Sequence, residues 1–181
     1  GLSAADTALV TPAAAVATAR AISRTAGVEV GVKWVNDLYY AGKKLCGILA
    51  EAPLGADGRP EFVVIGIGVN VLDASFPPEL SGVATSLEAA GAGEADRAAL
   101  AAAVIAEMLA LCGGLGERTF LAEYRARSCV LDRTVTLVRG EERREAYAVG
   151  IDDDARLLVR MPDGSSEAIG AGEISLRGDF A

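Results

Sequence analysis

Three β-forming segments follow one another along the first half of the chain, joined by short connections. They are Val28–Trp34, Lys44–Glu51 and Glu61–Val71, and their apolar residues have the pattern of strands. Ala41-Gly42 marks a reversal before the second segment, and Asp57-Gly58 lies in a loop before the third. Because short connections join antiparallel strands, the sequence predicts a meander in which the first two segments pair and the third adds to them.

Helices are predicted before and after this meander in the sequence. Thr11-Pro12 has the composition of a helix start, with threonine as cap and proline at the first helical position. The alanine-rich stretch then runs to about Thr25, and Gly27 ends it. Further helices are predicted over 96–111 and 117–127. We expect these helices to cover one face of the sheet, which makes the fold class α+β.

The pattern of residues changes at Cys129, after which short predicted strands alternate with polar turns. The five predicted strands are Thr134–Val138, Glu145–Gly150, Arg156–Arg160, Ser166–Ile169 and Glu173–Leu176. Five short strands within fifty residues favour a small SH3-like barrel. We therefore predict two domains, 1–128 and 129–181. The acidic run Asp152–Asp154 is interpreted as a turn between strands, and a cation site is disfavoured there.

Charge and composition exclude several classes of function. The net charge of −8 argues against a nucleic-acid partner. The absence of histidine excludes Ser-His and Cys-His catalysis and histidine-based metal sites. Three scattered cysteines form no metal-binding spacing and favour reduced thiols in the cytoplasm. The longest apolar run, Ala98–Ala106, is too short to span a bilayer.

Glycines give the predicted sheet its most informative local pattern. Gly66, Gly68 and Asn70 share one face of the third segment, because side chains alternate with period two. Gly47 and Leu49 share a face of the second segment. Aligned glycines would form a shallow trench that accepts a flat ligand. The alternative is that they make room for a packing helix.

Two charged residues lie near this trench. Lys44 could neutralise a carboxylate or phosphate, and Asp37 could hold or deprotonate an incoming amine. Their ordinary interpretations are a solvated lysine and a turn-forming acid beside Asn36. In a regular strand Lys44 and Gly47 would lie on opposite faces, so the site requires a β-bulge. Trp34, taken alone, is expected in the core.

The same residues resemble the pattern of biotin protein ligases. Lys33-Trp34-Val35-Asn36-Asp37 is similar to the family's Lys-Trp-Pro-Asn-Asp, with Val35 in place of proline. Further similar stretches are Gly42–Glu51, Val64–Asn70, Ala84–Leu87 and Gly172–Arg177.

The resemblance implies a class II synthetase-like ligase fold and a C-terminal SH3-like barrel. It also implies attachment of biotin to a lysine of a carboxylase carrier domain through biotinyl-adenylate, with ATP and Mg²⁺ but no protein metal site. By this resemblance Lys44 would bind biotin's carboxylate and the α-phosphate, and Asp37 would orient the acceptor lysine. Gly47, Leu49, Gly66 and Gly68 would line the biotin trench, whereas Lys33, Trp34, Asn36, Asn70 and Arg177 would surround the ATP-derived part.

One family motif, Gly-Arg-Gly-Arg-x-Gly-Arg, does not occur in the 181 residues. The family carries it upstream of the first helix, where it closes over the adenylate. Three explanations stay open: a piece of a longer ligase, a shortened homologue, or a non-catalytic binding or dimerisation module. Lipoate ligase-type chemistry is a further alternative, although the Lys-Trp-x-Asn-Asp and Gly-Glu-Ile-Ser-Leu-Arg elements favour biotin. A homodimer is possible, and no DNA-binding motif supports a repressor role.

Overall fold

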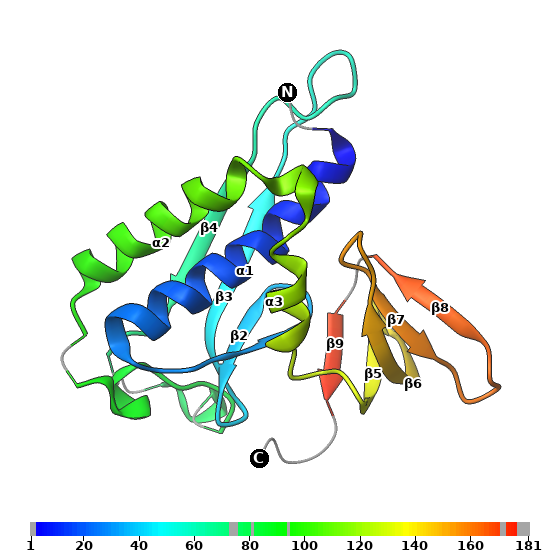
Figure 1. The fold of residues 1–181 in the computed structure, drawn as a ribbon. Coiled ribbons are helices and arrows are strands. Elements are labelled where there is room, and N and C mark those ends of the chain that lie inside the picture. The colour runs from blue at the N-terminus through cyan, green and yellow to red at the C-terminus, as the bar shows by residue number, and fades with distance from the viewer. Residues whose placement is uncertain (1–2, 73–75, 81, 94, 171–172, 177–181) are drawn as a thin grey trace.

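Two antiparallel sheets and a group of helices make up the protein (Figure 1). The computed structural model describes residues 3–72, 76–80, 82–93, 95–170 and 173–176. The first sheet has the order β1-β2-β3-β4. Its strands are β1 (Gly31–Lys33), β2 (Asp37–Tyr40), β3 (Lys43–Glu51) and β4 (Val64–Val69). The predicted α+β class is confirmed, and the sheet is an antiparallel meander, but of four strands where three were predicted.

The predicted partner of the Lys44–Glu51 strand is wrong. The β3 strand pairs with β2, and β1 lies outside β2 at the edge of the sheet. The chain therefore reverses twice, first at Trp34–Asn36 and again at Ala41-Gly42. Asn36 fixes the first reversal to β3, because its side-chain amide donates to the Ile48 carbonyl at 2.7 Å and its own carbonyl accepts from the Ile48 amide at 2.9 Å.

The first helix, α1 (Ala4–Ala26), begins seven residues before the predicted Thr11 cap. Ser3 and Asp6 form a reciprocal capping box at its N-terminus, which satisfies backbone donors that a helix start leaves free. Pro12 lies inside the helix, so proline did not mark the first turn here. The predicted end is confirmed, since Gly27 caps the helix in the left-handed conformation with φ of 66°.

Alanine lets α1 lie at the centre of the molecule. A helix that is apolar on nearly all sides is suited to burial, and small side chains allow close approach to the strands and to the other helices. The α1 residues that are fully buried are Ala13, Ala14, Ala15, Val16, Ala17, Thr18, Ala19, Ala21 and Ile22. Figure 1 shows α1 lying along the sheet, with α2 beside it.

The remaining helices are close to their predicted positions. They are α2 (Arg97–Cys112), capped by Asp96, and the shorter α3 (Leu121–Ala126). Short 3-10 or π turns occur at Pro78–Leu80, Glu88–Ala92 and Leu115–Glu117. Within the described ranges, none of the helices is both long enough and apolar enough to span a membrane.

The second sheet has the order β8-β7-β6-β5-β9. Its strands are β5 (Arg133–Arg139), β6 (Glu142–Ile151), β7 (Leu157–Arg160), β8 (Ser166–Ile169) and β9 (Glu173–Leu176), close to the five predicted. No pairing joins β8 to β9 among the described residues, so the closed barrel is not confirmed. The β9 strand pairs with β5 at the opposite edge from β8, and the sheet stays open. The domain boundary near Ser128 stays a prediction.

Candidate functional site

Three glycines open one face of the first sheet. In the β3–β4 pairing, Gly47 lies opposite Gly68 and Leu49 lies opposite Gly66, as the trench hypothesis requires. A Cβ built on Gly66 or Gly68 would have only a backbone oxygen within 4 Å, at 3.8 Å. Within the described part of the chain, no helix side chain fills that space. The alternative hypothesis of a packing helix is therefore wrong, because α1 packs on the other face.

A β-bulge in β3 brings Lys44 onto the glycine face. Leu38 pairs with Cys46 and Tyr39 pairs with Lys44, so Leu45 is an extra residue in β3. Its presence shifts the alternation by one position, and both Leu45 and Cys46 are buried. Lys44 and Gly47, three apart in sequence, consequently share a face: a Cβ on Gly47 would lie 3.2 Å from the Lys44 Nζ. This is the bulge that the sequence required but did not reveal.

Lys44 and Asp37 form an ion pair at the centre of this face. The Lys44 Nζ lies 2.6 Å from the Asp37 Oδ1, and the two side chains are 45% and 15% exposed respectively. The Oδ1 atom is buried and makes no hydrogen bond of good geometry with any described residue, so its interaction with the ammonium is mainly electrostatic. An anionic ligand that attracts the more exposed lysine would leave the carboxylate free to accept a proton or hydrogen bond.

Two adjoining hollows meet at Lys44, Gly47 and Gly68. The first has a volume of about 510 Å³, and its lining consists of Asn36, Asp37, Lys44, Gly47, Ile48, Leu49, Gly66, Ile67 and Gly68. The second has a volume of about 410 Å³, and its lining consists of Tyr39, Lys44, Cys46, Gly47, Gly68, Asn70, Phe76, Leu80, Val83 and Ala84. Two small-molecule groups could therefore lie on either side of one ammonium, which is the arrangement that joining them requires.

The loop after β4 fixes the backbone on both sides of Lys44. The Lys44 amide donates to the Val83 carbonyl at 2.8 Å, and the Thr85 amide donates to the Lys44 carbonyl at 2.9 Å. Asn70 holds the same loop, because its side-chain amide donates to the Thr85 carbonyl at 3.0 Å. The stretch Ala84–Leu87, selected by resemblance, thus lies beside the predicted lysine.

The other predicted nucleotide residues are spread more widely. Asn36 lines the first hollow, although its amide nitrogen is engaged by β3. Lys33 lies over the ring of Tyr39, with its Nζ 5.3 Å from the ring centroid. Trp34 is 3% exposed and lines neither of the two hollows. Arg177 lies outside the described residues.

Cys46 has the packing role expected from its sequence context. It is buried beneath the second hollow. Burial raises the pKa of its thiol to about 12, with a further rise from the nearby Asp37 carboxylate and an opposing effect from Lys44. The thiol therefore stays neutral and unreactive near neutral pH.

Several residues of the second hollow were not predicted from the sequence. Tyr39 is two positions from Asp37 and shares its face, so strand alternation could have identified it. Phe76, Leu80 and Val83 come from an irregular segment whose position depends on contacts with β3 and β4. No local pattern in that segment indicated a ligand-facing side chain.

Two family models match the chain. The model for the biotin/lipoate A/B protein ligase family matches residues 2–70, and the model for the biotin protein ligase C-terminal domain matches residues 130–177. The first match contains the ion pair and the glycines of both strands. The second contains the C-terminal sheet.

Related proteins match across most of the chain. A bifunctional ligase/repressor from Bacillus spizizenii is 34% identical over 161 residues, covering 83% of this chain and 48% of the relative. A biotin–[acetyl-CoA-carboxylase] ligase from Mycobacterium tuberculosis is 35% identical over 149 residues, covering 81% of this chain and 53% of the relative. The chain thus spans about half the length of these curated relatives.

A solved structure shows the same fold. The biotin protein ligase from Aquifex aeolicus, in complex with biotin and ATP, superposes with a TM-score of 0.78 at 25% identity, covering 98% of this chain and 73% of that one. The matches in sequence, in both family models and in fold agree with one another. This chain belongs to the biotin protein ligase family.

Proposed function

We propose that the protein contributes the central and C-terminal parts of an ATP-dependent ligase that attaches biotin to a lysine of a carboxylase carrier domain. The observation that carries this proposal is the single ammonium of Lys44 between two adjoining hollows, beside the Asp37 carboxylate. The curated relatives and the Aquifex complex support the identity of the ligands.

In the first step, biotin's carboxylate attacks the α-phosphate of ATP, forming biotinyl-adenylate and releasing pyrophosphate. The flat ring system of biotin would lie in the first hollow, over Gly47, Gly66 and Gly68, where absent side chains leave space. Lys44 would turn from Asp37 toward the carboxylate and the phosphate, where negative charge accumulates.

In the second step, the carrier lysine attacks the acyl carbon of the mixed anhydride and AMP leaves. The departure of the Lys44 ammonium toward the phosphate would expose the buried Oδ1 of Asp37. That oxygen would then hold the incoming amine and accept its proton. One ion pair would thus serve both steps, with its two members used in succession.

The nucleotide would occupy the second hollow, where Asn70 and Tyr39 contribute to the lining. Mg²⁺ would enter bound to the phosphates of ATP, whose charge it neutralises. The carrier domain, a homodimer and a cytoplasmic location remain predictions from the sequence.

The two alternatives, lipoate ligase chemistry and a binding module, predict different observations. The C-terminal family match is to biotin protein ligases specifically, which favours biotin over lipoate. A binding module without turnover would retain both hollows but form no adenylate.

Biotin-dependent exchange of pyrophosphate into ATP, measured on the protein at its full natural length, tests the first step. Lys44→Ala should lower this exchange by a factor of roughly 100 or more, because the charge that develops at the phosphate loses its counter-ion. Lys43→Ala is the matched control, since Lys43 is exposed and lines neither hollow. The control should retain exchange within about twofold.

Retention of exchange by Lys44→Ala would refute the role of this lysine. Calorimetry with biotin and ATP separates the remaining outcomes. Binding of both ligands without any exchange, by the protein at its full natural length, would support the non-catalytic module, and tighter binding of lipoate than of biotin would support the lipoate alternative.

A further inference from the structure

Trp34 belongs to the motif that precedes the candidate site, yet its indole lies in a junction between the two sheets. The side chain is 3% exposed. Its Nε1–H donates to the carbonyl of Ala155 at 2.9 Å. Ala155 lies in the turn between β6 and β7 and has a positive φ of 58°, which places it in the left-handed region. The first sheet thus contacts the C-terminal sheet directly beside Asn36 and Asp37.

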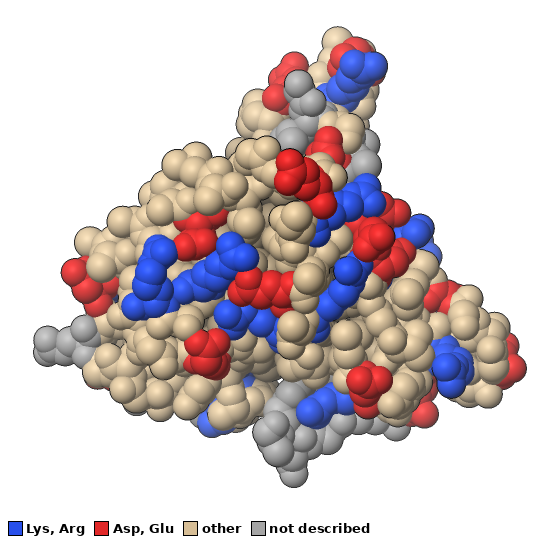
Figure 2. All heavy atoms as spheres, viewed as in Figure 1, with Lys and Arg blue, Asp and Glu red and all other residues tan. Residues whose placement is uncertain are grey.

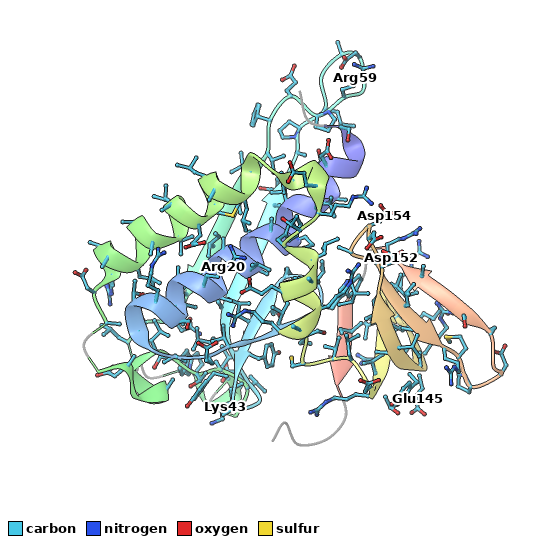
Figure 3. All side chains as sticks on the ribbon, in the orientation of Figure 1. Arg20, Lys43, Arg59, Glu145, Asp152 and Asp154 are labelled. Carbon is cyan, nitrogen blue, oxygen red and sulfur yellow. The ribbon has the colours of Figure 1, made fainter. Side chains whose placement is uncertain are left out.

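The same turn is held by α3 and the residues just before it. Arg125 of α3 donates from Nε to the Ile151 carbonyl at 2.8 Å, and its Nη2 lies 2.6 Å from the Asp153 Oδ1. Arg118 pairs with Asp154 at 3.2 Å. In Figure 3, Asp152 and Asp154 lie at the end of the second sheet that faces the helices. The acidic run is a turn, as expected, and it also docks the second sheet.

Tyr124, the residue next to Arg125, contacts the reversal that carries Asn36 and Asp37. Tyr124 is fully buried, and its hydroxyl donates to the Val35 carbonyl at 2.9 Å. Val35 lies between Trp34 and Asn36, in the reversal that carries Asp37. Adjacent residues of one short helix therefore hold the C-terminal turn and the catalytic reversal.

We propose that Trp34 is a positioning residue that couples the C-terminal sheet to the Asn36-Asp37 reversal, with Tyr124 and Arg125 completing the junction. The functional part of this inference rests on the proposed ligase function. Its structural part does not. We propose this role in place of the nucleotide contact that the resemblance implied for Trp34, because an indole that is 3% exposed offers no accessible face to a base.

Coupling of this kind is reciprocal. If the C-terminal turn holds the reversal, a ligand that orders the reversal must also stabilise the turn. Loosening the turn must in the same way loosen the reversal.

Trp34 is the sole tryptophan of the chain, so its fluorescence reports this junction directly. Arg125→Met removes both bonds to the turn and keeps most of the apolar stem. We expect acrylamide quenching of Trp34 to rise about twofold, and amide hydrogen exchange in residues 35–38 and 152–155 to rise about fivefold or more, because local opening becomes easier.

Arg144→Met is the matched control. Arg144 forms a comparable ion pair with Glu167, 2.7 Å from Nη1 to Oε1, within the second sheet and away from the junction. It should leave Trp34 quenching and the exchange of residues 35–38 unchanged. Equal responses of the two variants, or a response of Arg125→Met limited to residues 152–155, would overturn the coupling.

Hydrogen exchange measured with ligands added distinguishes this inference from the proposed function. Addition of biotin and ATP to the wild-type protein should slow exchange in residues 152–155, and in Arg125→Met this protection should be lost. Ligand binding that protects 35–38 without 152–155 would contradict reciprocity. Failure of either ligand to bind would count against the proposed function, while the difference between the two arginine variants would still decide the coupling.

Discussion

The two faces of the first sheet use the same strands for different purposes. On the face toward α1, Leu38, Leu45 and Ile48 are buried. On the opposite face, Leu49 is 62% exposed and the glycines leave hollows around one ion pair. Neighbouring residues in β3 therefore serve stability and binding alternately. Substitutions on the first face should change the free energy of unfolding, and those on the second should change ligand affinity.

The largest effect is expected on the buried face. Leu45→Ala should lower the free energy of unfolding by about 3 kcal/mol, because a fully buried side chain is replaced by a cavity. Urea unfolding followed by circular dichroism measures this change. Leu49→Ala is the control and should cost about 0.5 kcal/mol or less. Similar losses for the two leucines would erase the distinction between the faces.

Filling the open face should abolish binding without unfolding the protein. Gly68→Val places a branched side chain where both hollows meet, and we expect biotin affinity to fall about 100-fold as the site is blocked. Valine suits a strand, so stability should change by about 1 kcal/mol or less. Calorimetry with biotin and urea unfolding on the same sample test both parts. Unchanged affinity would place the ligand elsewhere.

A smaller change at Gly47 sharpens the comparison. Gly47→Ala would put a Cβ 3.2 Å from the Cε and Nζ of Lys44, so the flexible end of the lysine must shift. We expect biotin affinity to fall about tenfold, with little change in stability, because the group that moves is an exposed side chain. In a Lys44→Ala background, Gly47→Ala should no longer change biotin affinity, as a double-mutant cycle would show.

The smallest effect concerns the pH dependence of stability. Burial raises the pKa of the Cys46 thiol to about 12, so the folded protein keeps a proton that the unfolded chain loses near pH 9. The contribution of this thiol to the free energy of unfolding is complete below pH 9. It is lost as pH rises toward 12, and the free energy of unfolding should be lower by about 1 kcal/mol at pH 10. Comparison with Cys46→Ala isolates this contribution. Parallel pH profiles for the two proteins would contradict it.

Charges on the helix-bearing side of the molecule are used mainly in pairing with one another. Figure 2 shows basic and acidic side chains interspersed over that face, without a continuous basic track. Arg20 pairs with Glu123 at 2.6 Å and Arg24 with Glu107 at 2.7 Å, joining α1 to α3 and α2. These ion pairs therefore hold the three helices together on this face.

The sequence predicted most of the strands because alternation is a local pattern, but it missed β2 and with it the correct partner of β3. Spacing alone placed Gly66 and Gly68 on one face of their strand, whereas their alignment with Gly47 was a hypothesis that needed the register of β3 and β4. The position of Lys44 could not be predicted, because Leu45 has no feature that distinguishes a bulged leucine from a regular one. Only its pairing with β2 determines which residue is extra.

Other errors arose where tertiary contacts override local signals. Thr11-Pro12 is a plausible helix start, but the Ser3–Asp6 capping box lies upstream and the alanines favour continuation through Pro12. Trp34 was assigned to a ligand by resemblance, whereas its hydrogen bond to Ala155 depends on a turn 121 residues away. Barrel closure likewise depends on which edges meet, and short strands do not specify it.

The extra residue at position 45 also constrains how this sequence can change. If Leu45 were kept but the bulge were lost, a regular strand would send the Lys44 amine to the side occupied by α1, whereas deleting Leu45 would leave Lys44 two positions from Gly47 and on the glycine face. The side on which the Lys44 amine lies therefore depends on two features together, the number of residues before Gly47 and the bulge. An even number of residues between the lysine and the first glycine, as here, requires a bulge, and an odd number requires a regular strand.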